Sequence, residues 1–329
     1  MSPHLPPTGY AARDATTDDA PEIASLINET NIAEIGIPWT STEEVRDDLT
    51  SPGRQVGDDV VLVSEEGALV GYLTLWADTE PFTEVHQLVF VRPALWGRGL
   101  SSWLLRLGEE RARAKIDREP DGTIFLRASR WAGNDAARTL FGALGYRHAR
   151  TFDIMRRELD GPIAEPRIPE GIAIRTFDRE RDASAVHEAL AEAFADHWGG
   201  LTFPPFDGWL HEAIEGESSG FDPGLWFIAF DDGRIVGAVC ARHGTARAPE
   251  TGEVGTLGVR RRWRGRGLGQ ALLLAVFGEL AKRGVSTVEL GVDRESETGA
   301  TRLYDRVGMR VVYTHEAWEK ELLPARAGA

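Results

Sequence analysis

Hydrophobic and polar residues follow the same order of patterns twice along the chain. Each series predicts a short strand, amphipathic helical stretches, and two strands joined by a tight turn. A fourth strand then leads into a glycine-rich turn and a long apolar helix, and a strand, a helix and a last long strand follow. In the first series the predicted elements are a strand at 9–14, helices at 18–30 and 42–50, a turn at 65–67, a fourth strand at 84–91 and a long helix at 98–115. In the second series they are a strand at 171–177, helices at 179–196 and 206–214, a turn at 231–233, a fourth strand at 253–259 and a long helix at 266–283. This order predicts an α/β fold built on a mixed sheet.

The two series are also similar residue by residue. FVRPALWGRGLSSWLL (90–105) aligns without a gap with GVRRRWRGRGLGQALL (258–273), and three flanking segments repeat in the same order. Such repetition indicates a duplicated domain. Between the copies, the prolines and glycines of DGPIAEPRIPEG (160–171) favour a linker. We therefore predict an N-terminal half at 1–160, a linker at 161–170 and a C-terminal half at 171–329.

Composition narrows the class of protein. The 329 residues are 42% hydrophobic and 27% charged, as in ordinary globular proteins. No apolar run approaches the roughly 18 residues of a membrane span, and the N-terminus does not resemble a signal peptide, so we expect a cytoplasmic protein without a membrane partner. The net charge of −15 disfavours nucleic acids and mildly favours cationic ligands such as amines. The single cysteine, Cys240, is expected to be buried, and the eight histidines lack metal-binding spacing, so no metal is expected.

The glycine-rich turn RWRGRGLGQ (262–270) is the strongest chemical signal. A dinucleotide fingerprint fails because Gln270 stands where its third glycine would be, and no Walker sequence occurs. A tight turn alone explains one or two glycines but not the arginines among them. A helix starting here presents unpaired N–H groups to an anion, Gly265, Gly267 and Gly269 allow close approach, and Arg264 and Arg266 add charge. The turn therefore predicts a pyrophosphate site.

This turn resembles the acetyl-coenzyme A motif of the GNAT superfamily of N-acetyltransferases, which Arg264, Gly267 and Gly269 match. A second signature of that family is similar to NDAARTLFGALGY (134–146) and ETGATRLYDRVGM (297–309). The resemblance covers both halves. It implies two tandem GNAT domains, each a mixed, mostly antiparallel sheet flanked by helices, with acetyl-CoA as co-substrate.

The resemblance also implies which residues bind the coenzyme. In the second half the backbone of the fourth strand contacts the pantetheine arm, an N–H there polarises the acetyl carbonyl, and the turn binds the pyrophosphate; the first half offers the equivalent positions. The expected contacts are Leu257, Gly258, Val259, Arg264, Gly265, Arg266, Gly267, Leu268, Gly269 and Gln270, with Val89, Phe90, Val91, Gly97, Arg98, Gly99, Leu100, Ser101 and Asn134 in the first half.

Differences between the halves assign catalysis to the second. The first half has Trp96, Ser101 and Phe141 at the positions of Arg264, Gly269 and Tyr304. Trp96 offers no charge to a phosphate, and Phe141 offers no proton to a leaving thiolate. We therefore predict a catalytic C-terminal half and a degenerate N-terminal half, which either keeps a coenzyme or only shapes the interface.

Acetyl transfer to an amine needs a base for the ammonium and an acid for the thiolate. Glu253 is the predicted base, because strict alternation would place residues 253, 255, 257 and 259 on one face of the fourth strand. His243 and Asp293 are the reserve candidates. Tyr304 is the predicted acid, since it matches the family's tyrosine; the alternative is a half-buried aromatic of a helix.

The acceptor is predicted from the segment between the first two strands of the second half, 192–213. Its Asp196, His197, Trp198 and Trp209 suit an amine or sugar, or they are plain core. We predict a small-molecule amine as acceptor. We expect the protein to be a monomer or a homodimer. The alternatives are a cysteinyl aminosugar, which is the acceptor of a tandem family member of similar layout, a peptide N-terminus, or no acceptor at all in a non-catalytic acyl-CoA sensor.

Overall fold

The chain separates into two compact units, of which unit 1 comprises Met1–Thr151 with His315–Ala329 and unit 2 comprises Phe152–Thr314. The structure is a computed structural model and describes residues 5–77, 84–116, 123–198, 203–245, 248–296 and 298–323. Within these stretches no helix combines the length and the apolar character that crossing a bilayer requires. Both units show the α/β architecture expected of tandem domains.

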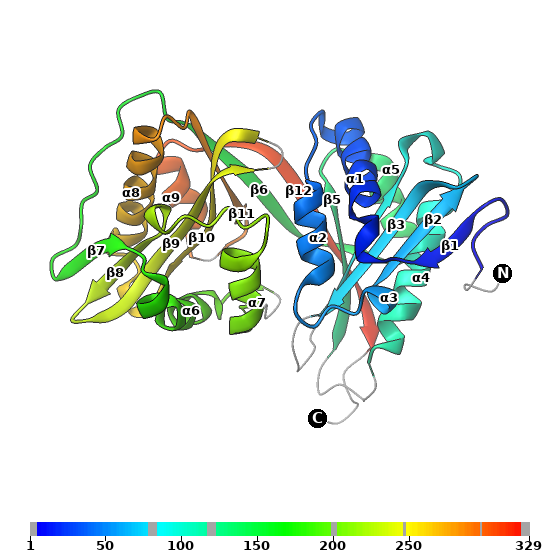
Figure 1. Cartoon of the computed structure of the whole chain (residues 1–329), viewed down its shortest axis with the longest axis horizontal. Coiled ribbons are helices and arrows are strands. Elements are labelled where there is room, and N and C mark those ends of the chain that lie inside the picture. Colours follow the sequence, from blue (N-terminus) through cyan, green and yellow to red (C-terminus); the bar gives the residue numbers. More distant parts are fainter. Residues whose placement is uncertain are drawn as a thin grey trace. The chain divides into compact units, whose positions relative to one another are not determined.

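Unit 1 has the sheet order β1-β2-β3-β4-β5-β12, in which only β4 and β5 are parallel. Helices cover both faces of the sheet (Figure 1). Its elements are β1 (Ala11–Asp14), α1 (Ala20–Ile35), α2 (Thr42–Thr50), α3 (Val56–Asp59), β2 (Val60–Glu65), β3 (Ala68–Ala77), β4 (Glu84–Val91), α4 (Leu100–Ala114), β5 (Ile124–Trp131) and α5 (Asp135–Ala143), with the end of β12 (Arg310–Leu323).

Unit 2 repeats this plan with the order β7-β8-β9-β10-β11-β6, in which only β10 and β11 are parallel. Its elements are the end of β6 (Arg147–Glu158), β7 (Ile172–Thr176), α6 (Arg179–Phe194), α7 (Phe206–Leu210), β8 (Phe227–Asp231), β9 (Arg234–Thr245), β10 (Ala248–Val259), α8 (Leu268–Lys282), β11 (Thr287–Asp293) and α9 (Ala300–Arg306). The predicted strands and helices are therefore present, with ends shifted by a few residues.

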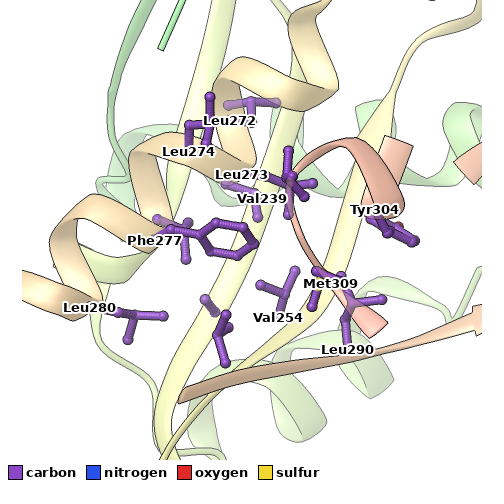
Figure 2. Packing of buried hydrophobic residues seen from close by; sticks show 14 of the residues in the cluster. Val239, Val254, Leu272, Leu273, Leu274, Phe277, Leu280, Leu290, Tyr304 and Met309 are labelled. Carbon is purple, nitrogen blue, oxygen red and sulfur yellow. The ribbon is translucent and has the colours of Figure 1, made fainter. Parts of the chain in front are cut away.

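The two faces of the unit 2 sheet have separate cores. Successive residues of β9 alternate between them, so that Val239 and Ala241 pack with α8 while Ala238 and Cys240 pack with α6. The α8 face holds the larger cluster, centred on Phe277, which is fully buried (Figure 2). Because α8 is apolar around most of its circumference, its burial fixes the place where the helix begins, next to the end of β10.

The last strand of each sequence half belongs to the unit of the other half. Within unit 2, β6 pairs with β11 from Thr287–Glu158 to Asp293–Phe152. Within unit 1, β12 pairs with β5 from His315–Trp131 onward. The sequence pattern predicted both long strands but not this exchange, so the compact units differ from the halves 1–160 and 171–329 at their last strands.

Candidate active site

The glycine-rich turn opens the N-terminus of α8. Gly265 and Gly267 have φ angles of +76° and +85°, and a Cβ built on either would meet nothing within 4 Å. The first helical bond runs from the Ala271 N–H to the Gly267 carbonyl at 3.0 Å. The amides of residues 268–270 therefore precede the helical hydrogen-bond ladder and suit an anion. This open backbone fits the pyrophosphate expected there.

Gly269 has a different reason to be glycine. A Cβ built on it would lie 3.2 Å from Leu303 of α9, 3.9 Å from Val259 and 4.0 Å from Leu257. The missing side chain therefore lets α8, α9 and the end of β10 meet closely, rather than admitting a ligand. In the first half Ser101 occupies this position and is half-buried.

Arg264 is engaged by the protein itself. Its Nε donates to the Val259 carbonyl at 3.0 Å, its Nη2 donates to the Ala193 carbonyl at 2.7 Å, and its Nη1 forms a 3.0 Å ion pair with Asp196. These bonds clamp the turn onto β10 and α6. Arg266, by contrast, is exposed and forms no ion pair or hydrogen bond with a described residue. A phosphate contact by either arginine stays a prediction, and the geometry favours Arg266.

The first half builds the same turn with other side chains. Gly97 and Gly99 have φ angles of +78° and +89° with open space in front of both. The Trp96 indole donates to the Val91 carbonyl at 2.7 Å, which is the bond that Arg264 makes to Val259. Arg98 is exposed and Leu100 is buried, as in the second half. Trp96 therefore preserves the shape of the turn.

In both units the two parallel strands separate before they end. The β10–β11 pairs run from Thr251–Thr287 to Val254–Leu290, although β10 continues to Val259. Among the described residues, 257–259 pair with β9 on one side only. The β4–β5 pairs likewise stop at Gln87–Ala128, and within the described part of the chain residues 89–91 pair only with β3. Each unit thus offers an unpaired strand edge beside its glycine-rich turn, where an extended amide-bearing arm fits.

Glu253 does not share a face with residues 257 and 259, because the register of β9 and β10 shifts between Val254 and Thr256. A β-bulge inserts one residue and reverses the alternation. Gly252 consequently faces Leu280 of α8, whereas Gly258 faces Leu190 of α6. The prediction of a single face was wrong for this reason, and Glu253 lies on the α6 side.

The carboxylate of Glu253 is ion-paired. Arg242, directly opposite on β9, contacts Glu253 Oε2 through Nε at 2.9 Å and through Nη2 at 2.7 Å, and its Nη1 donates to the Ser218 carbonyl. The Glu253 side chain is 22% exposed, so solvent reaches it. Of the reserve candidates, His243 is exposed, and Asp293 ends β11 and accepts a hydrogen bond from the Glu295 N–H.

Tyr304 projects from α9 into the edge of the α8-face core, near Met309 and Leu290 (Figure 2). Burial raises the pKa of its phenol to about 12. The phenol therefore keeps its proton at neutral pH, and its hydroxyl makes no hydrogen bond to any residue in the described part of the chain. Phe141, at the same place in unit 1, is buried against Tyr146 and Trp318.

Asn134 is occupied by local contacts. Its Oδ1 accepts the Ala137 N–H at 3.0 Å as the N-cap of α5, and its Nδ2 donates to Glu34 at 2.6 Å. These bonds explain why asparagine stands here without a ligand, and its coenzyme contact stays a prediction. Glu297, the corresponding position of the second half, lies outside the described residues.

The predicted acceptor residues differ in their surroundings. Asp196 is ion-paired with Arg261 and Arg264, and these bonds hold the pKa of its carboxyl below the usual value. Burial lowers the pKa of His197 despite the nearby Asp293 carboxylate. Trp209 is 3% exposed in the α6-face core, so packing accounts for it.

Trp198 stands apart because it contacts a residue from the first half, Phe152 of β6, with ring centroids 6.4 Å apart. Residues 199–202 of the same segment lie outside the described residues. Sequence reasoning missed Phe152 and Arg156, which lies further along β6, because nothing in the alternation of β6 indicates which sheet the strand joins.

Comparison with known proteins agrees with this geometry. The sequence matches the acetyltransferase (GNAT) family over residues 25–146 and again over 183–309. The chain belongs to this family. It is a tandem GNAT N-acetyltransferase, and enzymes of this family use acyl-CoA. The two matched ranges contain the glycine-rich turns that open α4 and α8.

Several relatives, each covered by this chain over about four fifths of its length, are named mycothiol acetyltransferase. The mycothiol acetyltransferase of Thermobispora bispora is 34% identical over 78% of this chain and 81% of its own, and that of Streptomyces coelicolor is 33% identical over 84% and 82%. Among solved structures, a GCN5-related N-acetyltransferase from Sphaerobacter thermophilus is 35% identical, with a TM-score of 0.79 over 98% of both chains. A tandem GNAT protein from the clavulanic acid pathway, 20% identical with a TM-score of 0.69 over 96% of this chain and 100% of its own, shares the fold.

Proposed function

We propose that this enzyme transfers the acetyl group of acetyl-CoA to the primary amine of a small molecule, and that it does so in unit 2. The observation that carries the proposal is the close meeting at Gly269, where α8, α9 and the end of β10 lie within 4 Å of one missing Cβ. It joins an open amide turn for a pyrophosphate, an unpaired strand edge for the pantetheine arm, and the helix that bears Tyr304. Acetyl-CoA supplies the thioester.

The side chains divide the proton transfers. Glu253 receives the proton that the amine loses, either directly or through a water, once the carboxylate turns from Arg242 toward the acceptor. Tyr304 donates its phenolic proton to the departing thiolate, whose free pKa is about 8.5. A phenol with a pKa of about 12 remains protonated throughout the neutral range. An N–H of residues 257–259 polarises the acetyl carbonyl.

The free energy needed to deprotonate the acceptor favours an α-amino group. An alkylammonium with a pKa near 10.4 costs about 4.6 kcal/mol to deprotonate at pH 7, whereas an α-ammonium with a pKa near 7.8 costs about 1 kcal/mol. Once it has turned from Arg242, the carboxylate of Glu253 is a sufficient base for the α-ammonium. The relatives named mycothiol acetyltransferase support the same choice, because the cysteinyl aminosugar acceptor of mycothiol synthase presents an α-amine. This acceptor is therefore our first candidate.

The first half is proposed to bind but not to catalyse. Its turn at 97–99 is as open as that of the second half. However, His86, stacked on Trp76 with ring centroids 5.1 Å apart, takes the place of Glu253 in the register with the third strand, and Phe141 replaces the tyrosine. Calorimetry with acetyl-CoA is expected to give two binding events per chain, of which one is catalytic.

The decisive experiment incubates the enzyme with acetyl-CoA and a panel of amines that includes the cysteinyl aminosugar. Free CoA is followed by chromatography, because this acceptor carries its own thiol, and the product is identified by mass. We expect the α-amino acceptor to be acetylated fastest. Tight binding of acetyl-CoA without turnover of any amine would contradict the proposal and leave a non-catalytic sensor.

A further inference from the structure

Four charged side chains form a row across the unit 2 sheet. Arg242 of β9 lies opposite Glu253 of β10, Glu253 lies beside Glu289 of β11, and Glu289 lies opposite Arg156 of β6. Paired residues of neighbouring strands point to the same face. The row therefore reads cation, carboxylate, carboxylate, cation, and the proposed base is one of its two central members.

The second carboxylate is deeply buried. Glu289 is fully buried, and Arg156 binds it through Nε at 2.7 Å and also through Nη2. An ionised carboxylate without a partner in such a place is costly and repels a neighbouring carboxylate. Arg156 therefore neutralises a charge that would otherwise act on Glu253. Because β6 is the last strand of the first half, this cation reaches the second half's site only through the strand exchange.

The remaining titratable groups near the row are mostly paired with other residues. Glu158 of β6 pairs with Arg310, Glu192 of α6 pairs with Arg260, and the imidazole of His187 contacts the Pro204 carbonyl. Tyr313 of β12 lies close enough to interact with Arg156. The segment after α7, which covers this face, adds three more groups, His211, Glu212 and Glu217. Glu289 and Arg242 are the charged residues in direct register with Glu253.

We propose that Arg156 and Glu289 are positioning residues for the acetyl transfer, which hold Glu253 in register and set the pH at which it accepts the amine's proton. The inference rests on the proposed role of Glu253. It makes the N-terminal half a contributor to the active site of the C-terminal half, in addition to any ligand that it binds itself. Neither residue needs to touch the substrate for this role.

The test compares the acid limb of kcat/KM against pH for four variants and wild type, with one acceptor throughout so that the amine's own titration is constant. Arg156→Gln is expected to move the acid limb up by about one pH unit and Glu289→Gln to move it down by a similar amount, since one neighbouring charge shifts a pKa by about 1–3 units. The acid limb of the double variant should lie near that of wild type. Arg156→Lys keeps the positive charge, so its acid limb should move much less than that of Arg156→Gln.

Controls separate this role from folding and from the proposed function. Arg310→Gln removes a cation from an exposed ion pair on the next strand and should leave the limb unchanged. The double variant removes both charges, so it can still be measured if a single variant does not fold. Single variants with unshifted limbs, or shifts of the same sign, would overturn the inference. An active Glu253→Gln enzyme would instead overturn the proposed base.

Discussion

Alanine at Gly267 and alanine at Gly99 form a matched pair that tests which half catalyses. Both glycines are N-caps in the left-handed region, with φ of +85° and +89°, and a Cβ at either position meets nothing within 4 Å. The two substitutions therefore carry the same backbone strain, on the order of 1–2 kcal/mol. For units of this size we expect each to lower the melting temperature by about 2–8 °C.

Activity should distinguish the pair. In Gly267→Ala the new methyl group stands in front of the amides proposed to hold the pyrophosphate. Weakening one hydrogen bond to a charged group costs about 1.5–3 kcal/mol, which corresponds to a rise of about 10- to 100-fold in the KM for acetyl-CoA. Gly99→Ala should leave kcat and KM within about twofold. Steady-state kinetics at saturating amine measure both.

The reasoning would fail in either of two ways. If Gly99→Ala raised the KM as much as Gly267→Ala, the first half would be taking part in turnover. If both variants lost thermal stability equally and neither changed the KM, the turn at residues 265–267 would not bind the coenzyme. Calorimetry on the same proteins shows which binding event each substitution removes.

Three further predictions follow from named contacts. Tyr304→Phe should lower kcat about 100-fold with unchanged binding of acetyl-CoA, and wild-type activity should show no basic limb from this phenol below pH 11, because it loses its proton only near its pKa of about 12; an unaffected kcat removes it as the acid. Arg264→Trp should keep the turn and change the KM for acetyl-CoA less than tenfold, because Trp96 already makes the same carbonyl bond in the first half. Asp182→Asn should lower the free energy of unfolding by about 2 kcal/mol at pH 7. Burial alone would raise the pKa of this carboxyl, but hydrogen bonds from Arg175 and Arg181 hold it below the usual 3.8. The stabilisation by Asp182 is therefore present above pH 4 and is lost as the pH falls through the lowered pKa. Urea unfolding of wild type and Asp182→Asn at pH 7 and at low pH checks this prediction, and a loss of stability that is the same at both pH values contradicts it.

The sequence predicted the elements of both units because their hydrophobic periods are regular and their turns carry clear signals. At the hairpin turns, Glu66 and Asp232 adopt positive φ next to glycines, as such turns require. The glycine-rich turn was likewise predictable, because glycine adopts the positive φ found at positions 265 and 267 with the least strain.

Three features could not be predicted from the sequence, for physical reasons. A bulge adds one residue without changing composition, so the reversal of faces between Glu253 and Leu257 left no trace in the alternation. Arg264 matched a motif, yet its partners, the carbonyls of Ala193 and Val259, are backbone atoms that any residues could supply. The strand exchange depends on which sheet edge a strand meets, and strand periodicity carries no such information.

The exchanged strands suggest a reason why the first half, which we propose does not catalyse, is retained. If the gene were cut at the linker, each product would lose the strand that closes its sheet: unit 2 would lose Arg156 from beside the fully buried Glu289, and unit 1 would lose Glu319 from beside Arg127. A single ancestral domain could have paired the same sheet edges by exchanging its last strand with an identical copy. After fusion that reciprocity became permanent, so selection could relax on the chemistry of one half while still opposing its deletion.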